Sequence, residues 1–227
     1  MVKRVTCSRV VVVSLLASAM IGFGAESSRA DAAKGKGVFE AKKCGSGDCH
    51  ITQGPATEKT FADQLKKKGP ELWYAGSKFK KEWLEKWLQD PIVIRPIEYN
   101  SLEKKNAGNH PKLSKAEADE VAEYLMTLTS KDVEAGVIQA NKNIQGKQAF
   151  EKKQACQACH QIEKTGKVVG GMVAPSLVKA GERLQGDWVY AYLKKPKVFK
   201  PVKRMPIYEG YLSDVDMKNV AALIASF

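Results

Sequence analysis

The sequence predicts an all-α protein made of two tandem helical domains. Two observations indicate this fold class. A segment that opens with Gly35 recurs in a segment that opens with Gly146, with the same order of motifs behind it, so the chain contains an internal repeat. Wherever apolar residues are periodic they follow helical spacing, and the period-two alternation of a strand is absent. We therefore expect domains at 33–128 and 146–227, joined by a polar linker at 129–145.

Residues 1–32 have the features of an export signal. Basic residues precede an apolar run from Val10 to Phe23, and small residues follow at a cleavage site after Ala32 or Ala30. The run is shorter than the about 20 residues that a membrane-spanning helix needs. We expect a signal peptide that directs the protein to the periplasm and is then removed together with Cys7. A retained membrane anchor is the alternative.

The chain is strongly basic, with a formal net charge of +12. Positive charge favours acidic partner surfaces. Nucleic acid is not expected as a partner, because an exported protein leaves the cytosol and no basic motif interleaved with aromatic residues is present. A chain of 227 residues with 44% hydrophobic and 27% charged residues suits one ordinary globular domain or two small ones. A large multidomain enzyme is excluded.

The first domain is expected to open with a short helix that runs from Gly35 towards a cysteine pair. An amphipathic helix follows, with aromatic residues at i, i+4 and i+8, and Pro91 ends it. The aromatic residues are Phe79, Trp83 and Trp87. The closing helix starts at a capping box formed by Ser114 and Glu117.

The second domain repeats these elements in the same order. A short helix from Gly146 leads into a second cysteine pair. Trp188 and Tyr192 stand where the first domain has two tryptophans, and Pro196 ends that helix. Ser213 starts the closing helix. Each domain is therefore expected to contain its own copy of the same helical unit.

Each cysteine pair is followed directly by a histidine. The second motif, Cys156-Gln157-Ala158-Cys159-His160, is the C-x-x-C-H pattern of c-type haem attachment, in which both thiols form thioethers and the histidine binds the iron. The first motif, Cys44-Gly45-Ser46-Gly47-Asp48-Cys49-His50, has a longer loop between its cysteines. We expect Gly45 and Gly47 to let this backbone bulge, because glycine accepts unusual backbone angles.

A disulfide, a thioredoxin-like redox pair and half of a zinc site are the competing interpretations of a cysteine pair. None of them explains a histidine directly after each pair at matched positions of a repeat. We therefore predict two covalently bound haem c groups, with His50 and His160 as proximal iron ligands. All four remaining thiols are then used, and no disulfide is expected.

With these motifs the sequence resembles the diheme class I cytochromes c, and its tandem arrangement is similar to the cytochrome c4 architecture. The resemblance covers nearly all of the mature chain: the haem motifs, the Pro-x-Leu segments, the tryptophan helices, and a Met-Pro pair before Leu-Ser and a last helix. It implies that each domain wraps around one haem. It also implies that Pro70 and Pro175 lie beside the proximal histidines, and that Trp83 and Trp188 approach the haem propionates, although plain packing also explains these tryptophans.

The expected distal iron ligands differ between the domains. Met205 stands in the Met-Pro frame where such cytochromes place the distal methionine. Met172 and Met217 are alternatives, and Met217 is better explained as a core residue of the last helix. In the first domain the same frame holds His110, which is the expected ligand there; Met126 or an open iron position are the alternatives.

Two fully ligated irons predict an electron carrier and not an enzyme. Histidine stabilises ferric iron more than a thioether does, so electrons are expected to run from a bis-histidine haem in domain 1 to a histidine–methionine haem in domain 2. The partners expected are respiratory redox proteins with acidic surfaces, attracted by basic residues between Lys194 and Arg204. A cytochrome subunit of a membrane respiratory complex and a diheme peroxidase, in which His110 leaves the iron, are the alternatives. The oligomeric state is left open.

Overall fold

The computed structural model describes residue 1 and residues 23–46, 49–202 and 204–227. The expected signal peptide therefore lies largely outside the described residues, as does Cys7. Within the described part of the chain, no helix is both long enough and apolar enough to cross a membrane.

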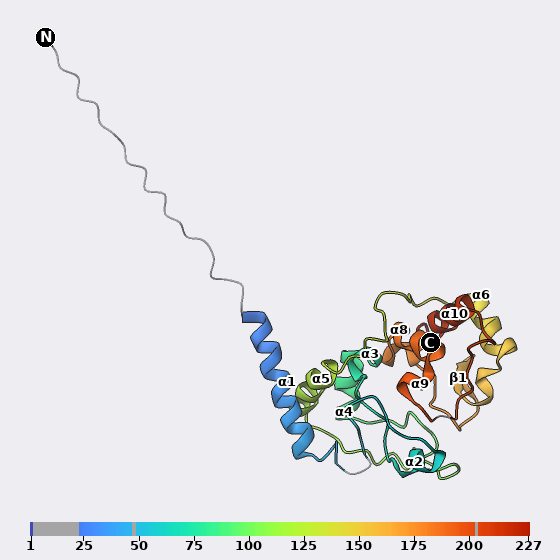
Figure 1. Ribbon diagram of the computed structural model, residues 1–227, viewed down its shortest axis with the longest axis horizontal. Coiled ribbons are helices and arrows are strands. Elements are labelled where there is room, and N and C mark those ends of the chain that lie inside the picture. Colours follow the sequence, from blue (N-terminus) through green and yellow to red (C-terminus); the bar gives the residue numbers. More distant parts are fainter. Residues whose placement is uncertain (2–22, 47–48, 203) are drawn as a thin grey trace.

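The first half of the described chain is helical. Its elements are α1 (Phe23–Ala41), α2 (Phe61–Lys66), α3 (Ala75–Lys78), α4 (Lys81–Gln89) and α5 (Lys115–Met126). The aromatic helix is α4, which ends just before Pro91 as expected. The capping box at the start of α5 is confirmed, because the Ser114 hydroxyl accepts from Glu117 N and the Glu117 carboxylate accepts from Ser114 N. α1 lies alongside α5 (Figure 1).

The second half contains counterparts of α1, α3, α4 and α5, and a small sheet. Its elements are α6 (Ile144–Gln148), the π-helical turn η1 (Ala149–Lys153), the 3-10 turn η2 (Cys156–Ala158), β1 (Gln161–Lys164), β2 (Lys167–Gly170), α7 (Ala180–Arg183), α8 (Gly186–Lys194), α9 (Pro196–Phe199) and α10 (Asp214–Ile224). The Ser213 hydroxyl accepts from Asp216 N and caps α10 as expected. α6 and α10 pack together, at the end of the molecule opposite α1 (Figure 1).

The all-α prediction is wrong at β1 and β2, which form an antiparallel hairpin. Thr165 and Gly166 make its turn with φ values of 49° and 75°, the left-handed backbone that a two-residue hairpin turn needs. Ile162 is buried, whereas every residue of β2 is exposed. A strand that buries one side chain needs no alternation of apolar and polar residues, so the pattern of a half-buried strand is missing from the sequence.

The close helix crossings occur at equivalent glycines of the repeat. A Cβ on Gly35 of α1 would lie 1.8 Å from the Glu120 carbonyl oxygen of α5. A Cβ on Gly146 of α6 would lie 2.3 Å from the Asn219 carbonyl oxygen of α10. Glycine therefore opens both repeats because the first and last helices of each half touch backbone to backbone at this point.

The two halves meet where α3 leads into α4 and where α7 leads into α8. Phe79 and Leu184 form an isolated antiparallel bridge, in which Lys80 N donates to Arg183 O at 2.9 Å and Gln185 N donates to Lys78 O at 2.9 Å. One apolar cluster extends through both halves around this junction.

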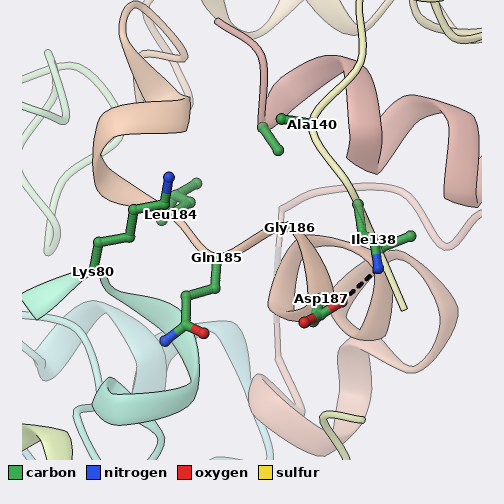
Figure 2. A pocket seen from close by; sticks show the side chains of 8 residues that line it. Lys80, Ile138, Ala140, Leu184, Gln185, Gly186 and Asp187 are labelled. Atoms are coloured by element: carbon green, nitrogen blue, oxygen red, sulfur yellow. Dashed lines mark hydrogen bonds between the residues drawn. The ribbon is translucent and has the colours of Figure 1, made fainter. Parts of the chain in front are cut away.

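The segment expected to be a linker is packed and not free. Val133, Val137 and Ile138 pack against the core, and the Asp187 carboxylate accepts from the backbone N–H groups of Gly136 and Ile138 at 2.8 and 2.7 Å. A pocket of about 260 Å³ lies between this segment and α8 (Figure 2). None of the expected haem-binding residues lines it.

Candidate haem sites

Each cysteine motif begins at a residue with left-handed backbone. Lys43, directly before Cys44, has a φ of 57°, and Ala155, directly before Cys156, has a φ of 45°. This conformation ends the preceding helix and turns the chain into the motif. Equivalent positions of the repeat therefore share the same unusual backbone.

The predicted backbone role of glycine in the first motif is not observed at Gly45, which has no positive φ, and Gly47 lies outside the described residues. A Cβ on Gly45 would lie 3.0 Å from the Phe39 ring. Glycine at this position therefore allows a close approach to Phe39.

The two histidines expected to be proximal ligands make the same hydrogen bond. His50 Nδ1 lies 2.8 Å from the Pro70 carbonyl oxygen, and His160 Nδ1 lies 2.7 Å from the Pro175 carbonyl oxygen. A carbonyl oxygen only accepts, so each Nδ1 carries the proton and each Nε2 keeps a free lone pair. Metal-bound histidines are held in this way. The proline positions implied by the resemblance are confirmed.

Burial keeps these imidazoles neutral. Burial lowers the pKa of both His50 and His160, although their bonds to Pro70 O and Pro175 O act in the opposite direction. Neutral imidazole is the form that binds a metal ion. Gly69, beside Pro70, is also required, since a Cβ there would lie 2.7 Å from both Cys49 O and His50 Cε1.

The His110 ring lies close to the His50 ring, at a spacing that suits two ligands of one metal ion. The two ring centres are 6.2 Å apart. An imidazole nitrogen lies about 2 Å from a coordinated metal and about 1.1 Å from its own ring centre, so two imidazoles on opposite sides of one ion have centres about 6 Å apart. His110 Nδ1 donates to Pro111 O at 3.0 Å, which again leaves Nε2 free, and the Trp87 ring lies 4.6 Å from the His110 ring.

In the second half, Met205 is half-buried against the core. Met217 is buried in the apolar face of α10, as its expected core role requires. Met172 is 49% exposed. His160 N donates to Cys156 O at 3.1 Å, which fixes the histidine directly behind its cysteine pair.

The described cysteines are all free thiols: Cys44, Cys49, Cys156 and Cys159. Burial raises the pKa of Cys156 to about 11 and also raises the pKa of Cys44. A redox-active cysteine pair needs a lowered pKa, so these thiols do not have the character of a thioredoxin-like pair. A cavity of about 480 Å³ adjoins the second motif and is lined by η2 residues and by β2. In the described ranges, no three His, Cys, Asp or Glu side chains gather as a metal-ion site.

Among the described residues, seven buried polar side-chain atoms lack a hydrogen-bond partner, and five of them can donate. The five are Trp73 Nε1, Tyr74 Oη, Arg95 Nε, Trp188 Nε1 and Arg204 Nε, and the other two are the oxygens of Glu58, which is ion-paired with Lys67. Buried donors normally have acceptors. The carboxylates of a haem are acceptors of the required charge, so the residues present fit that group.

The basic stretch near Met205 is divided between the interior and the surface. Lys200 binds Glu71, and Arg204 Nη2 donates to Ser101 O at 2.7 Å. These two cations therefore contact the first half and do not surround an exposed face. Lys195 and Lys197 are exposed. The inward position of Lys200 differs from the surface position expected from the sequence; the recurrence of Arg95-Pro96 as Lys200-Pro201 is the signal that points to it.

The family model of cytochrome c matches residues 144–227. The C-terminal part of the chain is a cytochrome c domain. A cytochrome c domain implies a covalently bound haem c in this part of the chain and suggests electron transfer. The cytochrome c domain contains Cys156, Cys159, His160 and Met205. No curated protein and no solved structure matches the chain.

Proposed function

We propose that this protein is an exported diheme c-type cytochrome that carries single electrons between respiratory partners. The cytochrome c domain at 144–227 supports one haem. The first half supports a second haem through its own cysteine pair, Cys44 and Cys49, and through His50 and His110. Haem, when bound, supplies an iron that changes oxidation state by one electron.

The proximity of His50 and His110 is the observation on which the proposal depends. Their ring centres are 6.2 Å apart, and each ring has its Nδ1 bonded to a proline carbonyl. These bonds leave each Nε2 free and hold the rings in place. Two protein ligands on one iron exclude a substrate from it, which favours a carrier over an enzyme.

In the second half His160 and Met205 are the proposed iron ligands. A thioether stabilises ferric iron less than an imidazole does, so the second haem has the higher potential. The proposed direction of electron transfer is therefore from the first half to the second.

Haem counting and a visible spectrum test the proposal. The purified mature protein should contain two haems per chain, and a count of one contradicts the diheme proposal. The spectrum of the dithionite-reduced protein should stay unchanged when carbon monoxide is added, because His110 and Met205 occupy both distal positions. A spectral change that corresponds to one haem contradicts the assignment of either His110 or Met205 as a distal ligand, and it favours the peroxidase-type alternative.

The proposed partners are redox proteins with acidic surfaces. Support comes from the exposed Lys195 and Lys197, which carry no ion pair with any described residue. The double variant Lys195→Glu/Lys197→Glu should slow electron exchange with an acidic partner by about tenfold at low salt and little at high salt. The exposed linker lysines in Lys131→Glu/Lys142→Glu provide a control with the same change in net charge. Equal slowing in both variants contradicts local steering.

Export to the periplasm is part of the proposal. The N-terminus of the mature protein should be Ala33, or Asp31 if the alternative cleavage site is used. Mass spectrometry of the purified holoprotein measures this directly. A full-length mass, with recovery in membranes at high salt, favours a retained anchor. Recovery in membranes only at low salt favours docking to a membrane respiratory complex.

A further inference from the structure

Two cationic side chains at equivalent positions of the repeat each contact the opposite half of the chain. Arg95 and Lys200 each precede a proline, and each follows shortly after the proline that ends an aromatic helix. The two halves are joined by an antiparallel bridge, so each of these segments is brought against the other half.

Arg95, from the first half, lies against the histidine-bearing loop of the second. Its Nη2 donates to Val173 O at 3.3 Å, and the Ser176 N–H donates to the carbonyl oxygen of Ile94 at 2.7 Å. Val173 and Ser176 flank Pro175, whose carbonyl oxygen accepts from His160. The guanidinium is therefore held at the proximal side of the second candidate haem site.

Lys200, from the second half, lies against the corresponding loop of the first. Its Nζ is 2.9 Å from Glu71 Oε2. Phe199 is fully buried, with its ring 5.1 Å from the Tyr74 ring. Glu71 directly follows Pro70, whose carbonyl oxygen accepts from His50. Each half therefore contributes one cationic side chain to the histidine-bonding loop of the other half.

The two cations differ in what neutralises them. Lys200 faces the Glu71 carboxylate, which Lys67 also contacts at 2.9 Å. Ser176 occupies the position equivalent to Glu71, and Arg95 forms no ion pair with any described residue. Arg95 Nε is buried without a hydrogen-bond partner. A cation that no protein carboxylate neutralises is available to offset the negative charge of a haem carboxylate and to act on the iron, whereas a cation already paired within the protein does so much less.

We propose that Arg95 is a positioning residue supplied in trans by the first half, which raises the reduction potential of the haem held by the second half. Its positive charge opposes the extra positive charge of ferric iron and favours the ferrous state. Lys200 has little corresponding effect on the first haem, because Glu71 neutralises it. This asymmetry increases the driving force for electron transfer from the first half to the second. The inference rests on the proposed diheme function.

Spectroelectrochemical titration of the holoprotein tests this role. The two waves are assigned by the charge-transfer band of methionine-ligated ferric haem. In Arg95→Gln, the equilibrium constant for transfer from haem 1 to haem 2 should fall about tenfold, equivalent to about 59 mV for one electron, through a lower haem 2 potential. Arg95→Lys should restore most of the loss, and Lys131→Gln, at an exposed linker position, should change nothing.

A second variant approaches the same question without altering Arg95. Ser176→Glu places a carboxylate where the first half has Glu71, so it should neutralise Arg95 and lower the haem 2 potential as Arg95→Gln does. An unchanged haem 2 wave in either folded variant overturns the proposal, as does an equal shift of both waves. A haem count of one per chain contradicts the proposed function instead, so the two failures are distinguishable.

Discussion

At the scale of single residues, hydrogen bonds to proline carbonyls decide which histidine nitrogen is available for iron. His50, His110 and His160 each use Nδ1 as a donor, so each leaves Nε2 free. Burial lowers the pKa of all three imidazoles, which keeps them neutral. The three histidines therefore have the tautomer and charge that iron ligation requires.

Replacing His110 tests its role as the distal ligand. His110→Met should raise the potential of haem 1, because a thioether stabilises ferric iron less than an imidazole does, and the two redox waves should move together. His110→Ala should open the iron, so that carbon monoxide changes the spectrum of one haem. A redox titration and a carbon monoxide spectrum measure these effects. Two variants with the wild-type spectrum and potentials contradict ligation by His110.

At the scale of elements, the helix pairs are held by backbone contact at glycine. α1 crosses α5 at Gly35, and α6 crosses α10 at Gly146, with space for no side chain at either point. Interiors tolerate added atoms poorly when the obstacle is backbone. These crossings fix how each cysteine motif leaves its helix.

Two glycines of α1 provide a matched pair for testing the crossing. Gly35→Ala should lower the free energy of unfolding by about 1 to 3 kcal/mol, because its Cβ meets Glu120 O. Gly37→Ala meets no heavy atom within 4 Å and should raise it by about 0.5 to 1 kcal/mol through helix propensity. Denaturant unfolding of the two holoproteins measures the difference. Equal stabilities would show that α1 is not held against α5 at Gly35.

At the scale of the whole molecule, buried charge connects the halves. Burial alone would raise the pKa of Glu71, but Lys200 and Lys67 hold it at about 2. Burial among aromatic rings lowers the pKa of Lys78 to about 7, with Lys200 and Arg183 acting in the same direction. The junction is therefore rich in positive charge, and Glu71 is the group that joins Lys200 to the first half.

The Glu71–Lys200 pair predicts an acid-sensitive junction. The pKa of Glu71 is below its ordinary 4.5, so its stabilisation is complete above about pH 4.5 and is lost as the pH falls towards about 2. Glu71→Gln should cost about 3 to 5 kcal/mol at pH 7, because Lys200 loses its carboxylate partner, whereas Lys67 keeps its ion pair with Glu58. The variant should also lose less stability on acidification. Thermal unfolding of the holoproteins at pH 7, 4.5 and 3 measures both effects; parallel pH profiles for the two proteins contradict this role of Glu71.

The sequence by itself determined the features that depend on nearby residues. The cysteine–histidine motifs, the capping boxes at Ser114 and Ser213, and the helix ends before Pro91 and Pro196 are local, so their spacing is sufficient to predict them. The frame that aligns His110 with Met205 is also local, and it placed His110 where the structure brings it opposite His50.

Only the tertiary structure decided the features that depend on contacts between distant segments. The hairpin of β1 and β2 buries one residue and leaves no periodic pattern to detect. In the sequence Lys200 cannot be told from a surface lysine. Its position beside Glu71 follows from how the two halves pack together. Arg95 reaches Val173 for the same reason. A charge placed by chain crossing has no signature in the spacing of its neighbours, because its partners lie about a hundred residues away along the chain.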